Sequence, residues 1–502
     1  MTTEIRPSVY QQAIYDAVTS SSSNLVIEAV AGSGKTTTIV RAVELLPETT
    51  TALFLAFNKS IATELKGRMP ANAEASTFHS LAFRALVKRV KFQTDDRKVW
   101  GLLRTACDLG FCTPKEYDDY GVGVVSLVAK AKHTGVGVLI DDTLDAWSAM
   151  IAHYGISFDS DDEPFAIWLA RIVLAANNHP VNHSVLDFDD YLYYLVLFKV
   201  ALPTYDVVFV DEAQDTNAIQ REILRRLVGK AGRLIAVGDT HQAIYGFRGA
   251  SHDAMALITA EFHAQTLPLS VSYRCSRAVV ESVQQYVPTI VAAPNAIVGN
   301  VDDWFDMHLN DFSATNADDV VLCRNTAPLI TLAYALLRNH VGVRVLGRDI
   351  GQGLVNLINK MKAQDLDTLI TKLEAYRAKE VTKLLAKERE DAAQAVEDKV
   401  ESIYAANDSY ALTLNVHGTI DGLIAHIMQL FNQQHGVLTL STVHKAKGME
   451  WRTVYLLDKQ LMPSKYARKE WQFRQEQNII YVAHTRAKES LYYIDSEQLL
   501  SD

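Results

Sequence analysis

The sequence predicts an α/β protein in which parallel strands alternate with helices, and three observations support this class. An apolar run, Asn24–Ile27, leads through the glycine-rich segment Ala29–Thr36 into a stretch of helical character. A β-branched run, Tyr205–Val210, ends in two carboxylates. Runs of strand type resume near Asp319 and again near Val437, so the pattern is repeated late in the chain. We therefore expect two α/β cores, each with a parallel sheet.

The glycine-rich segment has the composition of a P-loop. Gly32 and Gly34 allow backbone N–H groups to turn inward around a polyphosphate, and the start of the next helix adds a partial positive charge. Lys35 is placed to reach the outer phosphates, and the hydroxyl of Thr36 to ligate Mg²⁺. Ala29 stands where the usual pattern has glycine, and its small side chain is compatible with the same loop.

The two carboxylates after the β-branched run complete this prediction. Asp211 is expected near Mg²⁺, and Glu212 is expected to orient and deprotonate the attacking water. A third strand, Arg233–Asp239, leads to Gln242, whose amide is a candidate sensor of the γ-phosphate. Taken alone, two acids at a strand end can also be an ordinary turn. The P-loop upstream makes the catalytic interpretation the stronger one.

Length, charge and cysteine content set broad limits. The chain has 502 residues, which is too long for one ordinary core. Its net charge of −10 argues against coating nucleic acid by bulk attraction, but it leaves room for a local basic groove. The four cysteines show no metal-site spacing, and no apolar run is long enough to span a bilayer. We expect a cytoplasmic protein with no membrane partner.

Several residues allow two interpretations. Gln11 (or Gln12) precedes the P-loop and could read adenine, but an exposed helix position is the commoner role for a lone glutamine. Phe57 and Phe78 lie beside polar strand ends and suit either ligand contact or core packing, with packing favoured for Phe78. The helical stretch from Leu86 to His183 interleaves basic and aromatic residues, which suits a DNA-facing insert and a solvated surface equally well.

Taken in order along the chain, these sequence segments resemble those of superfamily 1 helicases of the UvrD/Rep/PcrA type. The resemblance rests on Asp211–Asp215, Gln242–Ala250 and Tyr481–Ala487 as a set. The short form Ala56–Ser60 looks closest to the F-box helicase branch and to compact bacterial or phage relatives. The resemblance implies two RecA-like P-loop cores, each with a mainly helical insert, ATP and Mg²⁺ as cofactors, and movement 3′ to 5′ on single-stranded DNA.

The resemblance also assigns roles to individual residues. The implied catalytic residues are Lys35, Asp211, Glu212, Gln242, Arg274 and Arg486, with Arg486 as an arginine finger from the second core. The implied ATP-binding residues are Gln11, Ala31, Gly32, Ser33, Gly34, Lys35, Thr36, Thr37, Tyr273 and Glu450. The implied metal ligands are Thr36 and Asp211. The implied DNA-binding residues are Phe57, Asn58, Thr77, His79, Tyr245, Phe247, Arg248 and His444.

The domain boundaries follow the same scheme. The first core is expected at residues 1–85 and 186–275 with an insert at 86–185, and the second at 276–350 and 436–502 with an insert at 351–435. Two departures from the family pattern stand out: Phe247 occupies a common tryptophan position, and Ser272 replaces a usual asparagine.

We therefore expect an ATP-dependent 3′→5′ DNA helicase that acts on single-stranded DNA and 3′-tailed duplexes, with a replication or repair protein as a candidate partner. One alternative is a translocase or sensing ATPase that strips proteins from DNA without productive unwinding. Another is an interaction protein with a decayed motor core. The intact Lys35, Asp211, Glu212 and Arg486 argue against that second alternative, and a small-molecule kinase would not need a second core.

Overall fold

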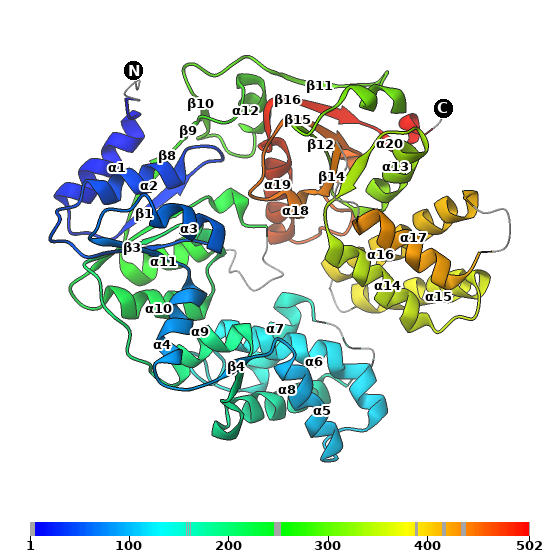
Figure 1. Ribbon diagram of the computed structural model, residues 1–502, viewed down its shortest axis with the longest axis horizontal. Helices are drawn as coiled ribbons and strands as arrows, with labels where there is room; N and C mark the ends of the chain where they lie inside the picture. Colours follow the sequence, from blue (N-terminus) through cyan, green and yellow to red (C-terminus); the bar gives the residue numbers. More distant parts are fainter. Residues whose placement is uncertain are drawn as a thin grey trace. The chain divides into compact units, whose positions relative to one another are not determined.

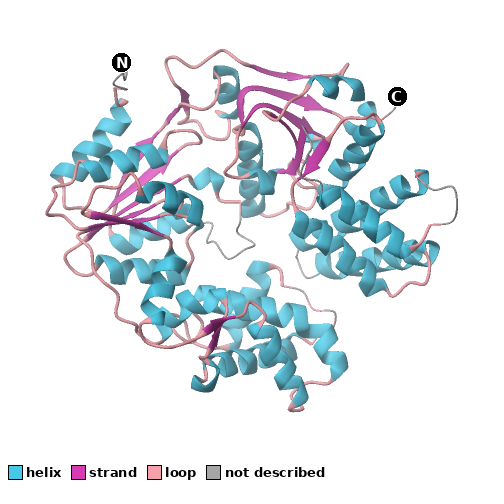
Figure 2. Ribbon diagram, in the orientation of Figure 1, coloured by secondary structure: helices cyan, strands magenta, loops and turns pink. Residues whose placement is uncertain are grey.

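The computed structural model describes residues 6–244, 253–386, 390–413, 418–432 and 438–500, apart from Ser157, Asp159 and Asp161. The chain divides into two compact units (Figure 1). The first unit comprises Met1–Val30 and Gly34–Ser270, and the second comprises Ala31–Ser33 and Val271–Asp502. Each unit holds a six-stranded sheet surrounded by helices, drawn in magenta and cyan in Figure 2. The α/β prediction is therefore confirmed, with one parallel sheet in each core.

The sheet of the first unit has the strand order β3-β2-β6-β7-β1-β8, and every neighbouring pair is parallel. Its strands are β1 (Leu25–Ala29), β2 (Ala52–Leu55), β3 (Ala73–Ser76), β6 (Val207–Val210), β7 (Arg233–Gly238) and β8 (Gln265–Leu269). All residues of β2 and β6 are buried, as expected for central strands covered on both faces. Because the strands are parallel, their carboxyl ends meet at one edge, where such sheets bind ligands.

Helices connect these strands. They are α1 (Val9–Ser20), α2 (Lys35–Glu44), α3 (Lys59–Lys66), α4 (Phe78–Val87), α9 (Phe188–Leu197), α10 (Ala218–Val228) and α11 (Ala254–Phe262). Of these helices, α1, α3, α4, α9 and α10 begin with side-chain N-caps. Short 3₁₀ turns follow two strands: η2 (Ala213–Asp215) after β6 and η3 (Thr240–Gln242) after β7. These connections place the starts of α2, α3, α4, η2 and η3 at the carboxyl edge of the sheet.

Between α4 and α9 the chain forms a helical insert. It consists of α5 (Lys98–Asp108), α6 (Pro114–Thr134), α7 (Leu144–Tyr154), α8 (Glu163–Asn178) and η1 (Pro180–Asn182), with β4 (Gln93–Thr94) and β5 (Val185–Leu186) paired at its base. The buried side chains of Trp147 and Val173 in the insert and of Val26 and Leu53 in the sheet belong to one continuous hydrophobic cluster. The insert is therefore packed into the core of the first unit.

The second unit has the strand order β11-β16-β15-β12-β14-β13, again entirely parallel. Its strands are β11 (Asn300–Asp303), β12 (Asp319–Cys323), β13 (Val343–Val345), β14 (Leu438–Thr442), β15 (Trp451–Leu457) and β16 (Ala487–Ile494), with a separate pair β9 (Val271–Ser272) and β10 (Val291–Ala292). The helices beside this sheet are α12 (Arg277–Val283), α13 (Thr326–Arg338), α18 (Val443–Ala446), α19 (Glu470–His484) and α20 (Ser496–Leu499), with 3₁₀ turns η5 (Leu309–Ala314) and η6 (Lys459–Leu461).

A second group of helices joins β13 to β14. They are α14 (Arg348–Met361), α15 (Leu366–Ala386), α16 (Glu390–Leu412) and α17 (Ile420–Asn432). Leu373 and Val400, which lie in the charged stretch of the sequence, are fully buried, as a packed helical insert requires. Within the described residues, no helix combines the length and the apolar character that crossing a bilayer requires. The six segment boundaries expected from the sequence remain predictions.

Candidate functional site

The P-loop lies between β1 and α2, at the carboxyl edge of the first sheet. Gly32 and Gly34 have φ values of +70° and +75°, the left-handed region that glycine adopts without strain. Gly34 is the N-cap of α2 and provides no side-chain cap, so the first N–H groups of the helix remain open to a ligand. The hydroxyl of Ser33 is buried and has no hydrogen-bond partner. These features fit an anion such as a nucleotide phosphate.

Lys35 lies among three carboxylates at this edge. Its Nζ is 3.4 Å from Oε1 of Glu212. Burial acts to lower the pKa of Lys35, but the attraction of Glu212, Asp239 and Asp211 outweighs it and raises the pKa above its ordinary value. Asp211 and Asp239 are almost fully buried. Three acidic groups facing one lysine leave an excess of buried negative charge, which favours binding of a further cation.

Asp211 and Thr36 are the residues best placed to hold Mg²⁺. The hydroxyl of Thr36 donates to Oδ2 of Asp211 at 3.1 Å. Among the residues that the structure describes, no group of three or more acidic, histidine or cysteine side chains could hold a metal by itself. Mg²⁺ usually binds one or two protein oxygens together with substrate phosphates and water. The hydroxyl and carboxylate of Thr36 and Asp211 therefore fit a nucleotide-bound Mg²⁺.

Glu212 is held in place by its backbone and by Gln214. Its backbone is left-handed, with φ of +52°, and its N–H donates to Oδ1 of Asp211 at 2.9 Å. The amide of Gln214 donates to Oε2 of Glu212 at 2.5 Å and accepts from the N–H of Asp239 at 3.0 Å. Gln214 is buried, so this bridge fixes the carboxylate of Glu212 relative to the end of β7. Sequence reasoning missed Gln214 and Asp239, although both follow strands of the sheet.

Gln242 and Gln11 approach this group from two other elements. Gln242 is buried in η3, and its amide donates to Oδ2 of Asp239 at 2.7 Å. Gln11 is buried in α1 and donates to the hydroxyl of Thr38 on the P-loop helix at 3.1 Å. Gln12 is exposed and bonds Asp16 instead. Of the two glutamines considered from the sequence, Gln11 is therefore the one beside the P-loop helix, whereas Thr37 on that helix is exposed.

In the second unit, four charged residues lie near the start of β15 and β16: Arg274, Glu450, Arg486 and Lys488. Nε of Arg274 is 2.6 Å from Oε2 of Glu450, and Nζ of Lys488 is 2.8 Å from Oε1 of the same carboxylate. Burial opposes ionisation of Glu450, yet Lys488 and Arg274 hold its pKa below the ordinary value. Arg486 is 1% exposed and donates to the carbonyl oxygens of Val482 and Met449. A finger role for Arg486 would require it to exchange these bonds for a phosphate.

Tyr273 and His444 lie in the same unit. Tyr273 is 45% exposed. His444 belongs to α18, directly after β14, and is half-buried. The contact of Tyr273 with adenine and that of His444 with DNA remain predictions.

Four of the residues predicted to contact DNA line one cavity of about 740 Å³ in the first unit. They are Phe57, Asn58, Thr77 and His79, and the same cavity reaches Asp211 and Glu212. Asn58 and Thr77 accept the N-cap bonds of α3 and α4. Tyr245, Phe247 and Arg248 lie outside the described residues.

The aromatic residues of this cavity differ in exposure. Phe57 is 55% exposed, so it does not pack in the core, whereas Phe78 is buried, as favoured from the sequence. His79 stacks on Phe188, with ring centroids 3.9 Å apart and planes 17° from parallel. Burial lowers the pKa of His79 to about 4, so the ring is neutral near pH 7 and suited to stacking rather than to phosphate binding. Phe188 is 53% exposed and was not singled out from the sequence.

The buried acid Asp211 gives a test of this electrostatic picture. Burial and the neighbouring Glu212 raise its pKa to about 6. Between about pH 4 and that value the folded protein binds more protons than the unfolded chain, so ionisation of Asp211 reduces stability as the pH rises. We expect Asp211→Asn to raise the free energy of unfolding at about pH 7.5 by about 1–3 kcal/mol, with a smaller gain at about pH 5. Urea unfolding in EDTA, followed by far-UV circular dichroism, measures both.

Asp206→Asn is the matched control. Hydrogen bonds from Thr51 hold the pKa of Asp206 below its ordinary value, so this substitution should lower stability near neutral pH. An Asp211→Asn protein that is less stable than the parent at pH 7.5 would contradict the account.

Comparisons with known proteins agree with this geometry. Residues 11–248 match a family model described as an AAA domain, and residues 359–498 match the UvrD-like helicase C-terminal domain. F-box DNA helicase protein 1 of Schizosaccharomyces pombe is 24% identical over 94% of this chain and 55% of its own length. ATP-dependent DNA helicase Rep of Salmonella typhimurium is 30% identical over 34% of this chain and 24% of its own, and UvrD1 of Mycobacterium bovis is 26% identical over 54% and 38%.

The chain thus spans about half or less of the length of these relatives. The two matched families cover parts of both units, in the order that the two sheets occupy along the chain. The chain is thus similar to the UvrD-like helicases of superfamily 1, including their F-box helicase branch.

Proposed function

We propose that this chain is an ATP-driven motor on single-stranded DNA, which moves 3′ to 5′ and separates duplex strands. The observation that carries the proposal is the cavity of the first unit, which joins Asp211 and Glu212 to the exposed aromatic rings of Phe57 and Phe188. A strand bound there contacts the same walls as the catalytic acids. DNA binding and hydrolysis are thereby physically linked.

Glu212 is the proposed general base. It accepts the proton of the water that attacks the γ-phosphate, and Gln214 holds its carboxylate in orientation. Mg²⁺, when bound with the nucleotide at Thr36 and Asp211, supplies positive charge against the phosphate oxygens. Lys35 exchanges Glu212 for phosphate oxygens as its partner when the nucleotide arrives, which frees Glu212 for the water. Binding of the nucleotide thus brings Lys35 and Glu212 into their catalytic arrangement.

Arg274 and Arg486 are the proposed charge partners of the γ-phosphate from the second unit. Both donate to backbone or carboxylate groups of their own unit, so binding phosphate requires an exchange of partners. An exchange of that kind gives ATP different interaction energies with two conformations, which is what a motor cycle needs. Tyr273 is proposed to stack on adenine, and Gln11 to contact its edge.

The strand is proposed to bind through stacked bases. Phe57 and Phe188 supply rings, as do Tyr245 and Phe247, which are outside the described residues, and His444 supplies a contact in the second unit. Base–aromatic stacking contributes about 1–3 kcal/mol per base and tolerates any sequence, as a motor requires. The polarity follows from the family resemblance, and the helicase names of the relatives favour DNA over RNA.

Removing the general base tests the hydrolytic role. We expect Glu212→Gln to lower the DNA-stimulated kcat for ATP by about 10²–10⁴-fold, because proton transfer from water is lost. Phosphate release with and without single-stranded DNA measures this. Glu44→Gln removes an acid from the exposed end of α2, where it pairs with Arg41, and should leave kcat unchanged. Equal kcat in Glu212→Gln and the parent would refute the assignment.

Duplexes with single-stranded tails test the motor and its direction. The parent protein should open a 3′-tailed duplex in the presence of ATP and leave a matched 5′-tailed duplex closed. A motor that moves 3′ to 5′ along single-stranded DNA reaches the duplex only from a 3′ tail. Release of a fluorescent strand reports opening, and displacement of streptavidin from biotinylated oligonucleotides reports translocation. ATP turnover with streptavidin displacement but no duplex opening would instead favour a stripping translocase.

Substitution of Phe188 tests whether its ring belongs to the DNA-binding surface. Loss of one stacked base should raise the Kd for a fluorescent oligo(dT) by about 5–150-fold in Phe188→Ala, the range that corresponds to 1–3 kcal/mol. Phe198→Ala is the control, because Phe198 is also about half exposed but follows the opposite end of α9 and does not line the cavity. Similar Kd values for Phe188→Ala and the parent would remove this ring from the DNA surface.

A further inference from the structure

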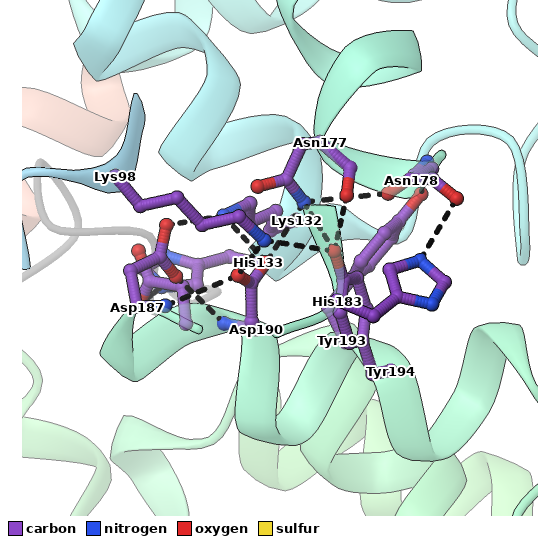
Figure 3. Close-up of polar contacts among 11 residues, drawn as sticks. Lys98, Lys132, His133, Asn177, Asn178, His183, Asp187, Asp190, Tyr193 and Tyr194 are labelled. Atoms are coloured by element: carbon purple, nitrogen blue, oxygen red, sulfur yellow. Dashed lines mark hydrogen bonds and ion pairs between the residues drawn. The ribbon is translucent and has the colours of Figure 1, made fainter. Parts of the chain in front are cut away.

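A cluster of buried charges links the helical insert to the first turn of α9 (Figure 3). Nζ of Lys132 on α6 is 2.5 Å from Oδ2 of Asp187 and 2.7 Å from Oδ1 of Asp190. Nζ of Lys98 on α5 is 2.7 Å from Oδ2 of Asp190. Asn177 on α8 donates to Oδ1 of Asp190 at 2.8 Å. Three helices of the insert therefore converge on two carboxylates.

The cluster is balanced in charge and closed to water. Lys132 and Asp190 have fully buried side chains, and those of Lys98 and Asp187 are at most 9% exposed. Asp190 accepts from both lysines, from Asn177 and from the N–H of Asp187. Such a group has strict geometry, because displacement of either carboxylate leaves a lysine buried without its partner. An apolar contact would tolerate sliding that this cluster does not.

The two carboxylates also start α9. Asp187 is the N-cap and Asp190 the third residue of the helix, and each accepts the backbone N–H of the other. Phe188 is the first residue of the helix and lies between them. The half-exposed ring of Phe188 is thus carried by a turn whose flanking side chains are both tied to the insert.

His133, the residue after Lys132, makes a second contact between the insert and α9. Nε2 of His133 lies 2.9 Å from Oδ1 of Asp189, which follows Phe188 in the same turn. On the other side, Phe188 stacks on His79 at the start of α4. The ring stack needs the first turn of α9 and the first turn of α4 to keep their separation, with centroids 3.9 Å apart. The insert fixes one of those two turns.

We propose that Lys132 and His133 are positioning residues for DNA binding: through Asp187, Asp190 and Asp189 they hold Phe188 against His79. The inference rests on the proposed function, since it assumes that Phe188 stacks on a base. It assigns the insert of the first unit a role in DNA affinity that requires no contact between Lys132 or His133 and DNA.

The test compares oligo(dT) binding and DNA-free ATP turnover in the parent, in Phe188→Ala, in a pair variant of the buried cluster, and in that pair variant with Phe188→Ala added. Lys132→Met/Asp187→Asn removes one charge of each sign, and asparagine retains the N-cap. We expect its Kd for oligo(dT) to rise about tenfold, with DNA-free kcat and KM for ATP unchanged. Adding Phe188→Ala to this pair should raise Kd by less than twofold more, because the stack is already lost.

Arg221→Met/Glu261→Gln is the matched control. It removes a largely buried ion pair of 3.1 Å elsewhere in the first unit, so it reproduces general destabilisation without touching the stack. Its Kd for oligo(dT) should equal that of the parent. His133→Ala, which alters a partly exposed contact and leaves the buried cluster whole, provides a variant that folds even if the pair variant does not. We expect its Kd to rise by several-fold.

The outcomes separate the two proposals. If Phe188→Ala weakens binding but neither Lys132→Met/Asp187→Asn nor His133→Ala does, the positioning role is overturned and the proposed function stands. A pair variant in which Phe188→Ala still exerts its full effect also overturns it. If Phe188→Ala itself leaves Kd unchanged, the stacking surface fails, and the positioning role fails with it.

Discussion

The interaction on which the structure depends is that of Lys35 with the acidic groups around it. One buried ammonium faces Asp211, Glu212 and Asp239, all placed at the carboxyl edge of one parallel sheet. Burial is the main cause that raises the pKa values of Asp211 and Asp239, and the charge of Glu212 adds to it. Such an arrangement is unfavourable for the empty protein and favourable once further positive charge arrives. Sites built for catalysis often carry a cost of this kind in stability.

The parallel sheet explains how distant residues reach this point. β1, β6 and β7 are neighbours, so the P-loop, the acidic pair and the turn with Gln242 follow adjacent strand ends although they are far apart in sequence. Gln214 then bridges two of these strand ends with a single amide. The end of β7 is therefore connected to Glu212 through two hydrogen bonds of Gln214. The cavity beside it extends the same edge towards α4 and α9.

Residues governed by local pattern were predictable from the sequence. The P-loop and the acidic pair have fixed spacing within strand–turn–helix units, so the sequence alone indicated that Lys35 and Thr36 would follow one strand and Asp211 and Glu212 another. Phe188 could not be singled out in this way, because its importance comes from stacking on His79 from a helix 109 positions away in the chain. The short run of Asp187 to Asp190 carried a signal, an aromatic residue between capping acids, but its partners Lys98 and Lys132 lie in another part of the sequence. The fusion of the insert with the sheet core also depends on long-range packing.

The most direct test of the central claim is the thermal stability of the protein with a non-hydrolysable ATP analogue. If Lys35 and the acidic group form the nucleotide site, the analogue with Mg²⁺ at about 100 times its Kd should raise Tm by about 5–10 °C in the parent. The same addition should leave Tm unchanged in Lys35→Met, and omission of Mg²⁺ should greatly reduce the shift in the parent. An equal shift in Lys35→Met, or none in the parent at millimolar analogue, would contradict the account.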